Sequence, residues 1–237
     1  MLNRALSLTI WLKDMNIYHA IFRSSLGKKF IMGLSGLALV GFVVGHMVGN
    51  LQIFLGQEKI NAYGAFLKSM PKLLWAARIG LVACVGLHIW SAIALVRENR
   101  RARPVAYQVT RSTASFASRT MIWSGLIVLS FIVYHLFDFT ITPEFKGVDE
   151  SGRHDIYKMV VLSFSHPLSA GFYILANTLL AIHLSHGFQS LFQSLGLSTG
   201  RFRHWYQSLA LVLGWLIFVG NVSIPTAVLL GFGKEVL

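Results

Sequence analysis

Residues 37–54 read LALVGFVVGHMVGNLQIF, an apolar stretch with one histidine, His46, inside it. Three other apolar runs carry a histidine in the same way: LVACVGLHIWSAIAL at 81–95 holds His88, LIVLSFIVYHLFDF at 126–139 holds His135, and ILANTLLAIHLSH at 174–186 holds His183. Ionisable groups inside a bilayer are costly and usually mark function. These four histidines are therefore the first candidates for a functional site.

The composition indicates an integral membrane protein. Of the 237 residues, 54% are hydrophobic and only 13% are charged, whereas ordinary soluble domains carry about 25% charged residues. Several apolar runs of about 20 residues are long enough to span a bilayer as helices, and no alternating pattern of barrel strands is present. The net charge of +12 is explained by lysine and arginine in loops and at headgroups, so no nucleic-acid partner is expected.

Cysteine usage limits the chemistry. Cys84 is the single cysteine and lies inside an apolar run, which excludes a disulfide framework and an iron–sulfur cluster built from this chain's own thiolates. The sequence contains no C-x-x-C-H motif, so a haem in this chain would be of the b type.

The fold predicted is all-α, an integral membrane bundle of five transmembrane helices. An N-terminal interfacial segment is expected at 1–27, and a single bundle at 28–237. The predicted helices lie at about 28–55, 72–96, 120–140, 157–192 and 204–230. Residues 57–71 are predicted to be a polar connection, and the length of the fourth helix favours a kink or a restart near His166-Pro167.

The distribution of basic residues predicts the topology. Five spans put the termini on opposite sides of the membrane. The side that holds the N-terminus, residues 97–119 and residues 201–203 has 13 lysines and arginines, and the other side has 8. The positive-inside rule therefore places the N-terminus in the cytoplasm, in a multi-pass protein of the cytoplasmic (inner) membrane.

This topology sorts the four histidines by depth. His46 is 18 residues past Lys28, roughly 27 Å along the first helix, and His135 is 16 residues past Arg119, roughly 24 Å in the same direction. Both are predicted to lie toward the outer side, and His88 and His183, on helices of opposite direction, toward the inner side. Two layers of two imidazoles each match two bis-histidine haems, with His46 and His135 at the outer one.

Other interpretations of the histidines remain open. A lone histidine in a span also serves as a proton relay or an interhelical hydrogen bond. Zinc is not expected, because a zinc site needs three or four clustered ligands. His186 competes with His183, three residues away on nearly the same face. The glycines of the first helix allow either close helix packing or room for a flat macrocycle. Weaker candidates lie in loops or near span ends: His154, His166 and His204.

At these residues the chain resembles the cytochrome b membrane anchor of succinate:quinone oxidoreductases, in its single-chain, five-helix, di-haem form. The matching pieces, in chain order, are GHMVGNLQIF, GLHIWSA, VYHLFDF, HLSHGFQSLFQSLG and GNVSIP. The family's last ligand is followed by glycine in H-x-x-x-G, which fits His183 with Gly187 and demotes His186. The family pairs its first ligand with its third and its second with its fourth, in agreement with the depth argument.

The resemblance implies cofactors and partners. They are two haems b, held by His46, His88, His135 and His183, and a quinone, menaquinone in this five-helix class. A flavoprotein subunit would oxidise succinate to fumarate, and an iron–sulfur subunit would pass electrons to this chain, which would be an electron-transfer subunit without dicarboxylate chemistry of its own. The alternatives are a fumarate reductase anchor, a haem b anchor of another respiratory oxidoreductase, and a transporter with histidine proton relays.

One departure from the family concerns protons. Some di-haem members carry a glutamate two residues before the fourth ligand, and Ala181 stands here, so that proton pathway is not expected. Asp138 is the nearest intramembrane acid to the outer pair, a candidate for quinone protonation or for capping the helix end. Residues near span ends are candidates for holding haem propionates: Lys28, Lys29, Ser35 and Arg119.

Overall fold

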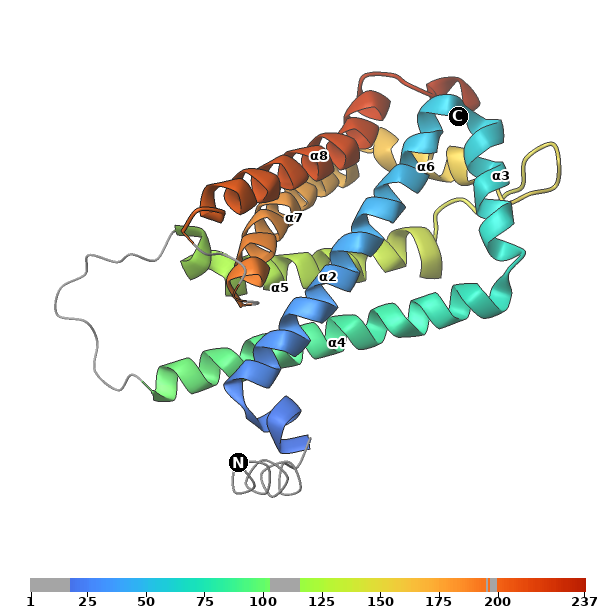
Figure 1. Ribbon diagram of the computed structural model, residues 1–237. Helices are drawn as coiled ribbons and strands as arrows, with labels where there is room; N and C mark the ends of the chain where they lie inside the picture. The colour runs from blue at the N-terminus through green and yellow to red at the C-terminus, as the bar shows by residue number, and fades with distance from the viewer. Residues whose placement is uncertain (1–17, 103–115, 195, 197–199) are drawn as a thin grey trace, which may run out of the picture. The chain divides into compact units, whose positions relative to one another are not determined.

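The computed structural model describes residues 18–102, 116–194, 196 and 200–237 (Figure 1). The chain divides into two compact units, which are described separately. Unit 1 comprises residues 1–39 and 80–111, and unit 2 comprises residues 40–79 and 112–237. Helices make up nearly all of both in the described ranges, where the only pairing of β type is an isolated bridge between Val148 and His154.

Within the described residues, five helices are long and apolar enough to cross a membrane, which confirms the all-α, five-helix prediction. The first and third each continue into a short turn of different helical pitch. The five are α2 (Ser25–Asn50) with the 3₁₀ turn Leu51–Leu55, α4 (Pro71–Arg101), α5 (Phe116–Leu136) with the π turn Phe137–Ile141, α7 (Pro167–Ser194) and α8 (Arg203–Leu229). Which membrane face the N-terminus occupies stays a prediction.

The fourth predicted helix restarts at Pro167, as the sequence indicated. α6 (Ile156–Ser165) ends before His166, whose backbone is extended, and α7 begins at Pro167. Proline suits the first position of a helix because its missing N–H has no partner there in any case. The amino end of α6 is capped by Asp155, whose carboxylate accepts a hydrogen bond from the backbone N–H of Lys158.

The predicted polar connection after the first span is helical. α3 (Gln57–Lys68) buries Ile60, Asn61 and Gly64 on one side. Gly64 lies three residues after Asn61 and four after Ile60, which is the spacing of one helix face. The sequence prediction treated the segment as a loop because its charged residues obscure the short apolar face, which packs on α6 and on the 3₁₀ turn Leu51–Leu55.

In unit 1, the described residues of α2 and α4 are joined by a buried cation. Lys28 is only 7% exposed. Its ammonium group forms an ion pair with Glu98 and donates to the Arg23 carbonyl oxygen at 2.9 Å. Phe22 and Trp90 of the same unit also pack together, with ring centroids 6.0 Å apart.

In unit 2, α7 packs along both α8 and α5 (Figure 1). The α7–α8 contact depends on Gly214 of α8, where a Cβ would overlap the Ser185 hydroxyl and lie 3.1 Å from the Ala181 carbonyl oxygen. Ala181 is 6% exposed. The position at which some family members carry a proton-conducting acid is therefore a small residue buried against a neighbouring helix.

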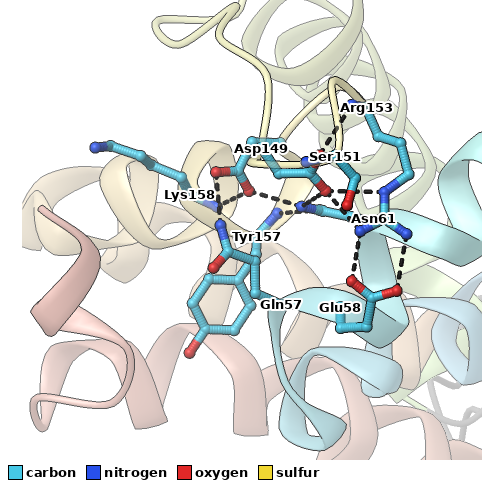
Figure 2. Close-up of polar contacts among 9 residues, drawn as sticks. Gln57, Glu58, Asn61, Asp149, Ser151, Arg153, Tyr157 and Lys158 are labelled. Carbon is cyan, nitrogen blue, oxygen red and sulfur yellow. Dashed lines mark hydrogen bonds and ion pairs between the residues drawn. The ribbon is translucent and has the colours of Figure 1, made fainter.

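The polar end of unit 2 is held by a buried amide (Figure 2). Asn61 of α3 is fully buried. Its Nδ2 donates to Asp155 at 3.0 Å and to Asp149 at 3.2 Å. Arg153 donates to Asp149 at 2.9 Å and to Glu58 at 2.9 Å. These contacts fasten residues 142–155 to α3.

Candidate functional site

Two of the four predicted ligands, His46 of α2 and His135 of α5, lie together in unit 2. Their ring centroids are 5.7 Å apart and their planes are nearly perpendicular, at 86°. Phe42 stacks on His46 from one turn earlier in α2, with centroids 5.3 Å apart and planes at 19°. Both imidazoles keep part of their surface exposed in the chain by itself. The structure thus brings together the outer pair that the depth argument predicted.

One ring nitrogen of His135, Nδ1, contacts a tyrosine of another helix. Nδ1 of His135 lies 3.3 Å from the hydroxyl of Tyr173 on α7. That hydroxyl donates to a carboxylate oxygen of Asp138 at 2.9 Å. Since a phenol has one hydrogen, its oxygen is the acceptor toward His135, and the imidazole proton is on Nδ1. The lone pair of His135 is then on Nε2.

In unit 1, His88 of α4 is held by the backbone of α2. Its Nδ1 lies 3.1 Å from the carbonyl oxygen of Met32. A carbonyl oxygen only accepts, so this nitrogen carries the proton and the lone pair is on Nε2. Gly36, one turn further along α2, leaves room for the ring, because a Cβ at this position would lie 3.1 Å from Cε1 of His88.

In unit 2, His183 of α7 is held by a serine of α5. Its Nδ1 lies 3.0 Å from Oγ of Ser124, which donates to the carbonyl oxygen of Met121 at 3.0 Å. The single hydroxyl hydrogen can serve either contact, so Ser124 holds the ring of His183 whichever ring nitrogen carries the proton. A Cβ at Gly125 would make an ordinary 3.5 Å contact with the same ring.

Two of the four predicted ligands, His88 and His135, therefore share one tautomer. In metal sites, a histidine ligand almost always donates its other ring N–H to an outer partner, which fixes the tautomer and the ring orientation. The contact of His183 with Ser124 is compatible with the same arrangement. A proton relay has no such requirement for a single tautomer, so the pattern favours ligation.

The geometry of the outer pair fits a haem iron. Two imidazoles on one metal, each with a metal–nitrogen distance of about 2 Å, have ring centroids about 6 Å apart. The 5.7 Å between His46 and His135 is close to this separation. Gly41 and Gly45 on α2 have nothing within 4 Å of a Cβ position, so the helix leaves open space at those two positions. His88 and His183 belong to different units, and their pairing stays a prediction.

The predicted propionate partners lie in different surroundings. Of the predicted propionate partners, Lys28 is paired with Glu98, Lys29 is exposed, and Ser35 is buried with its hydroxyl bonded to the Ile31 carbonyl at 2.6 Å. The side chain of Arg119 lies outside the described residues. No contact of the first three tests a propionate role.

Asp138 caps no helix through its side chain in the described contacts. Its carboxylate accepts instead from Tyr173 and from Ser163 of α6, at 2.9 and 3.0 Å. A role in quinone protonation stays a prediction. His166 is mostly exposed, 3.5 Å from Glu144, and His154 lies in the loop before α6, as expected of the weaker histidine candidates.

Sequence reasoning missed the residues that contact three of the predicted ligands, namely Met32, Ser124 and Tyr173. A hydroxyl within an apolar run is a visible signal for the last two, because a polar group in a span needs a partner. The partner itself depends on how two helices are rotated about their axes, which no local pattern specifies. The Met32 contact is made by the backbone and leaves no trace in the sequence.

A family model described as the succinate dehydrogenase/fumarate reductase transmembrane subunit matches residues 96–222. The matched segment includes His135 and His183 and excludes His46 and His88. Comparisons with curated proteins and with solved structures gave no match.

Proposed function

The chain belongs to the family of succinate dehydrogenase/fumarate reductase transmembrane subunits, and from this we propose that it is a di-haem cytochrome b anchor that passes electrons between an iron–sulfur subunit and menaquinone. The family makes it a multi-pass membrane subunit of an oxidoreductase complex. In the proposed role, succinate is oxidised in the flavoprotein subunit, and this chain supplies the route to the quinone.

The observation that carries the proposal is the approach of His46 and His135. Two imidazoles from different helices, 5.7 Å between centroids, are costly to hold together in a membrane without a ligand between them. The Nδ1 bond from His135 to Tyr173 directs its remaining lone pair to a metal. The corresponding bonds of His88 and His183 support the second proposed haem.

Each part of the site has a defined task in this function. His46 with His135, and His88 with His183, would be the axial ligands of an outer and an inner haem b. A bound haem supplies reversible one-electron transfer at its iron, at a potential set by the axial ligands and their hydrogen bonds. Tyr173, Ser124 and the Met32 carbonyl orient three of the ligand rings, and the apolar helices around them exclude water.

Fumarate reduction is the alternative to succinate oxidation. The family description covers both enzymes, and the anchor performs the same chemistry in either direction. The choice depends on the haem potentials relative to that of the quinone.

The test is a haem count on the purified complex. Pyridine haemochrome analysis is expected to give two haems b per copy of this chain, and succinate is expected to reduce at least one of them without an added mediator. A complex that contains this chain and oxidises succinate but carries no haem would contradict the proposal. In that case the histidines pack or relay protons instead.

A further inference from the structure

A chain of hydrogen bonds leads away from His135 through three elements of unit 2. It starts at Nδ1 of His135 on α5, 3.3 Å from the Tyr173 hydroxyl on α7, and continues 2.9 Å to Asp138 in the π turn Phe137–Ile141. Ser163 of α6 donates to the same carboxylate oxygen at 3.0 Å, and its hydroxyl lies 3.2 Å from that of Ser169. A carboxylate therefore lies behind the hydrogen-bond partner of His135.

The direction of every bond in this chain is determined by the carboxylate. Asp138, when ionised, has acceptor atoms only, so Tyr173 and Ser163 each donate their single hydroxyl hydrogen to it. The Tyr173 oxygen can then only accept from His135, and the Ser163 oxygen only from Ser169. All hydrogens point toward Asp138, and the imidazole is locked in the tautomer whose Nε2 carries the lone pair.

Packing keeps Tyr173 in this position. Its side chain is 4% exposed. The rings of Phe131, Phe139 and Phe164 pack against it, with centroids 5.2, 5.7 and 4.8 Å away. A phenol enclosed in this way has no competing water for its hydroxyl, so the bond to His135 depends on Asp138 alone for its direction.

We propose that Tyr173, oriented by Asp138, is a positioning residue that fixes the tautomer of His135 and lowers the reduction potential of the outer haem. The inference rests on the proposed function, because it concerns a ligand of one of the two haems. The acceptor of the His135 bond is a hydroxyl that itself donates to a carboxylate, which gives the imidazole more anionic character and stabilises ferric iron. The partner of His88 is a neutral carbonyl oxygen.

A purely structural role for the cluster makes a different prediction. The same bonds tie α5, α6 and α7 together, so a structural role would alter the thermal stability of the complex and leave both potentials unchanged. The positioning role alters one potential of the two. Redox potentials therefore separate the two roles, whereas electron-transfer activity alone does not.

The experiment compares Tyr173→Phe, Asp138→Asn and the double variant in the complete complex. Tyr134→Phe is the matched control, because it also removes a tyrosine hydroxyl, from the residue next to His135, and Tyr134 is exposed. The readouts are the haem b content, the midpoint potential of each haem and the low-spin ferric electron paramagnetic resonance spectrum.

We expect Tyr173→Phe to raise the midpoint potential of the outer haem and to shift its ferric signal, with the inner haem unchanged. Asp138→Asn should shift the outer potential in the same direction. The double variant should shift it no further than Tyr173→Phe alone, because Asp138 acts through Tyr173 and coupled residues are not additive. Tyr134→Phe should match the wild type.

Two kinds of result would overturn the inference, and they distinguish a failure of the proposed function from a failure of the positioning role. A wild-type complex without haem overturns the proposed function and this inference together. A wild-type complex with two haems, whose outer potential and ferric signal are unchanged in Tyr173→Phe, overturns the positioning role alone. Should Tyr173→Phe fail to assemble, an unchanged outer potential in Asp138→Asn overturns it equally.

Discussion

At the scale of single residues, the polar atoms beside each candidate ligand are the most informative feature of the chain. The donor and acceptor inventory of a backbone carbonyl and of a tyrosine bonded to a carboxylate assigns the same tautomer to His88 and His135. The two neighbours are unrelated. Their agreement is what a common role as ligands predicts.

A substitution at Gly36 tests the inner haem site proposed for His88 and His183. Alanine here favours the helix by about 1 kcal/mol, but its Cβ would lie 3.1 Å from Cε1 and 3.3 Å from Nδ1 of His88. We expect Gly36→Ala to displace the ring and to broaden or diminish the absorption band of the inner haem only. Gly80→Ala is the control, since its Cβ would have nothing within 4 Å. Identical spectra for the two variants would refute the expectation.

Asn61 tests the polar end of unit 2. Asn61→Ala would leave the backbone N–H of Tyr157 without its present acceptor at 3.1 Å and would remove the amide donor from Asp149 and Asp155. Each buried group left unsatisfied costs about 1–3 kcal/mol. The variant should lower the thermal unfolding temperature of the detergent-solubilised complex by several degrees. Lys59→Ala, an exposed change on the same helix, should leave it unchanged.

At the scale of elements, the length of the apolar runs predicts the membrane-spanning helices but does not predict the helix α3 between the first two of them. Runs of about 20 apolar residues leave little choice but a membrane helix, and Pro167 marks the restart of α7. The helix α3 was missed because its polar and charged residues obscure a short apolar face. The hydrogen-bond partners of the ligands were missed because they depend on helix rotation. The approach of His46 and His135 could be predicted because helix length alone, with no knowledge of rotation, gives their depth, and their role as ligands stays a prediction.

The loop at 142–155 is expected to loosen in acid. A hydrogen bond from Arg153 holds the pKa of Glu58 below its ordinary value of 4.5. Partial desolvation raises the pKa of Asp149, but bonds from the backbone and side chain of Arg153 and from Asn61 outweigh it, and the pKa falls below 3.8. A carboxyl whose pKa is lowered in the folded state stabilises that state above its unfolded pKa and loses this effect as the pH falls through the folded pKa.

Hydrogen exchange measures this effect directly. The amides of residues 149–155 should keep constant protection between pH 7 and pH 5 after correction for the intrinsic exchange rate. Protection should decrease only below the ordinary values of 4.5 and 3.8. An Arg153→Gln variant should show weak protection across the whole range. A loss of protection already at pH 6 in the wild type would point to a histidine instead.

At the scale of the whole molecule, the charge distribution predicts the orientation in the membrane. The N-terminal side carries 13 of the 21 lysines and arginines, and the positive-inside rule places that side in the cytoplasm. The iron–sulfur subunit would then meet a basic surface on the inner side, next to the haem proposed for His88 and His183.

Single cysteines report this orientation. In a Cys84→Ser background, which removes the chain's one native thiol, Glu150→Cys should react with a membrane-impermeant maleimide added to intact cells. Gln108→Cys should react only in everted vesicles. The reverse pattern would place the N-terminus outside and exchange the assignments of the inner and outer haems, while leaving the ligand pairs intact.

The most direct test of the central claim is a redox titration of the haem b bands in the purified complex, for the wild type and for His46→Ala, His88→Ala, His135→Ala and His183→Ala. The wild type should titrate in two steps. His46→Ala and His135→Ala should lose one and the same step, because their rings lie 5.7 Å apart, and the other two variants should lose the second. If His46→Ala and His135→Ala lost different steps, or neither lost one, the two histidines would not share an iron and the account would be wrong.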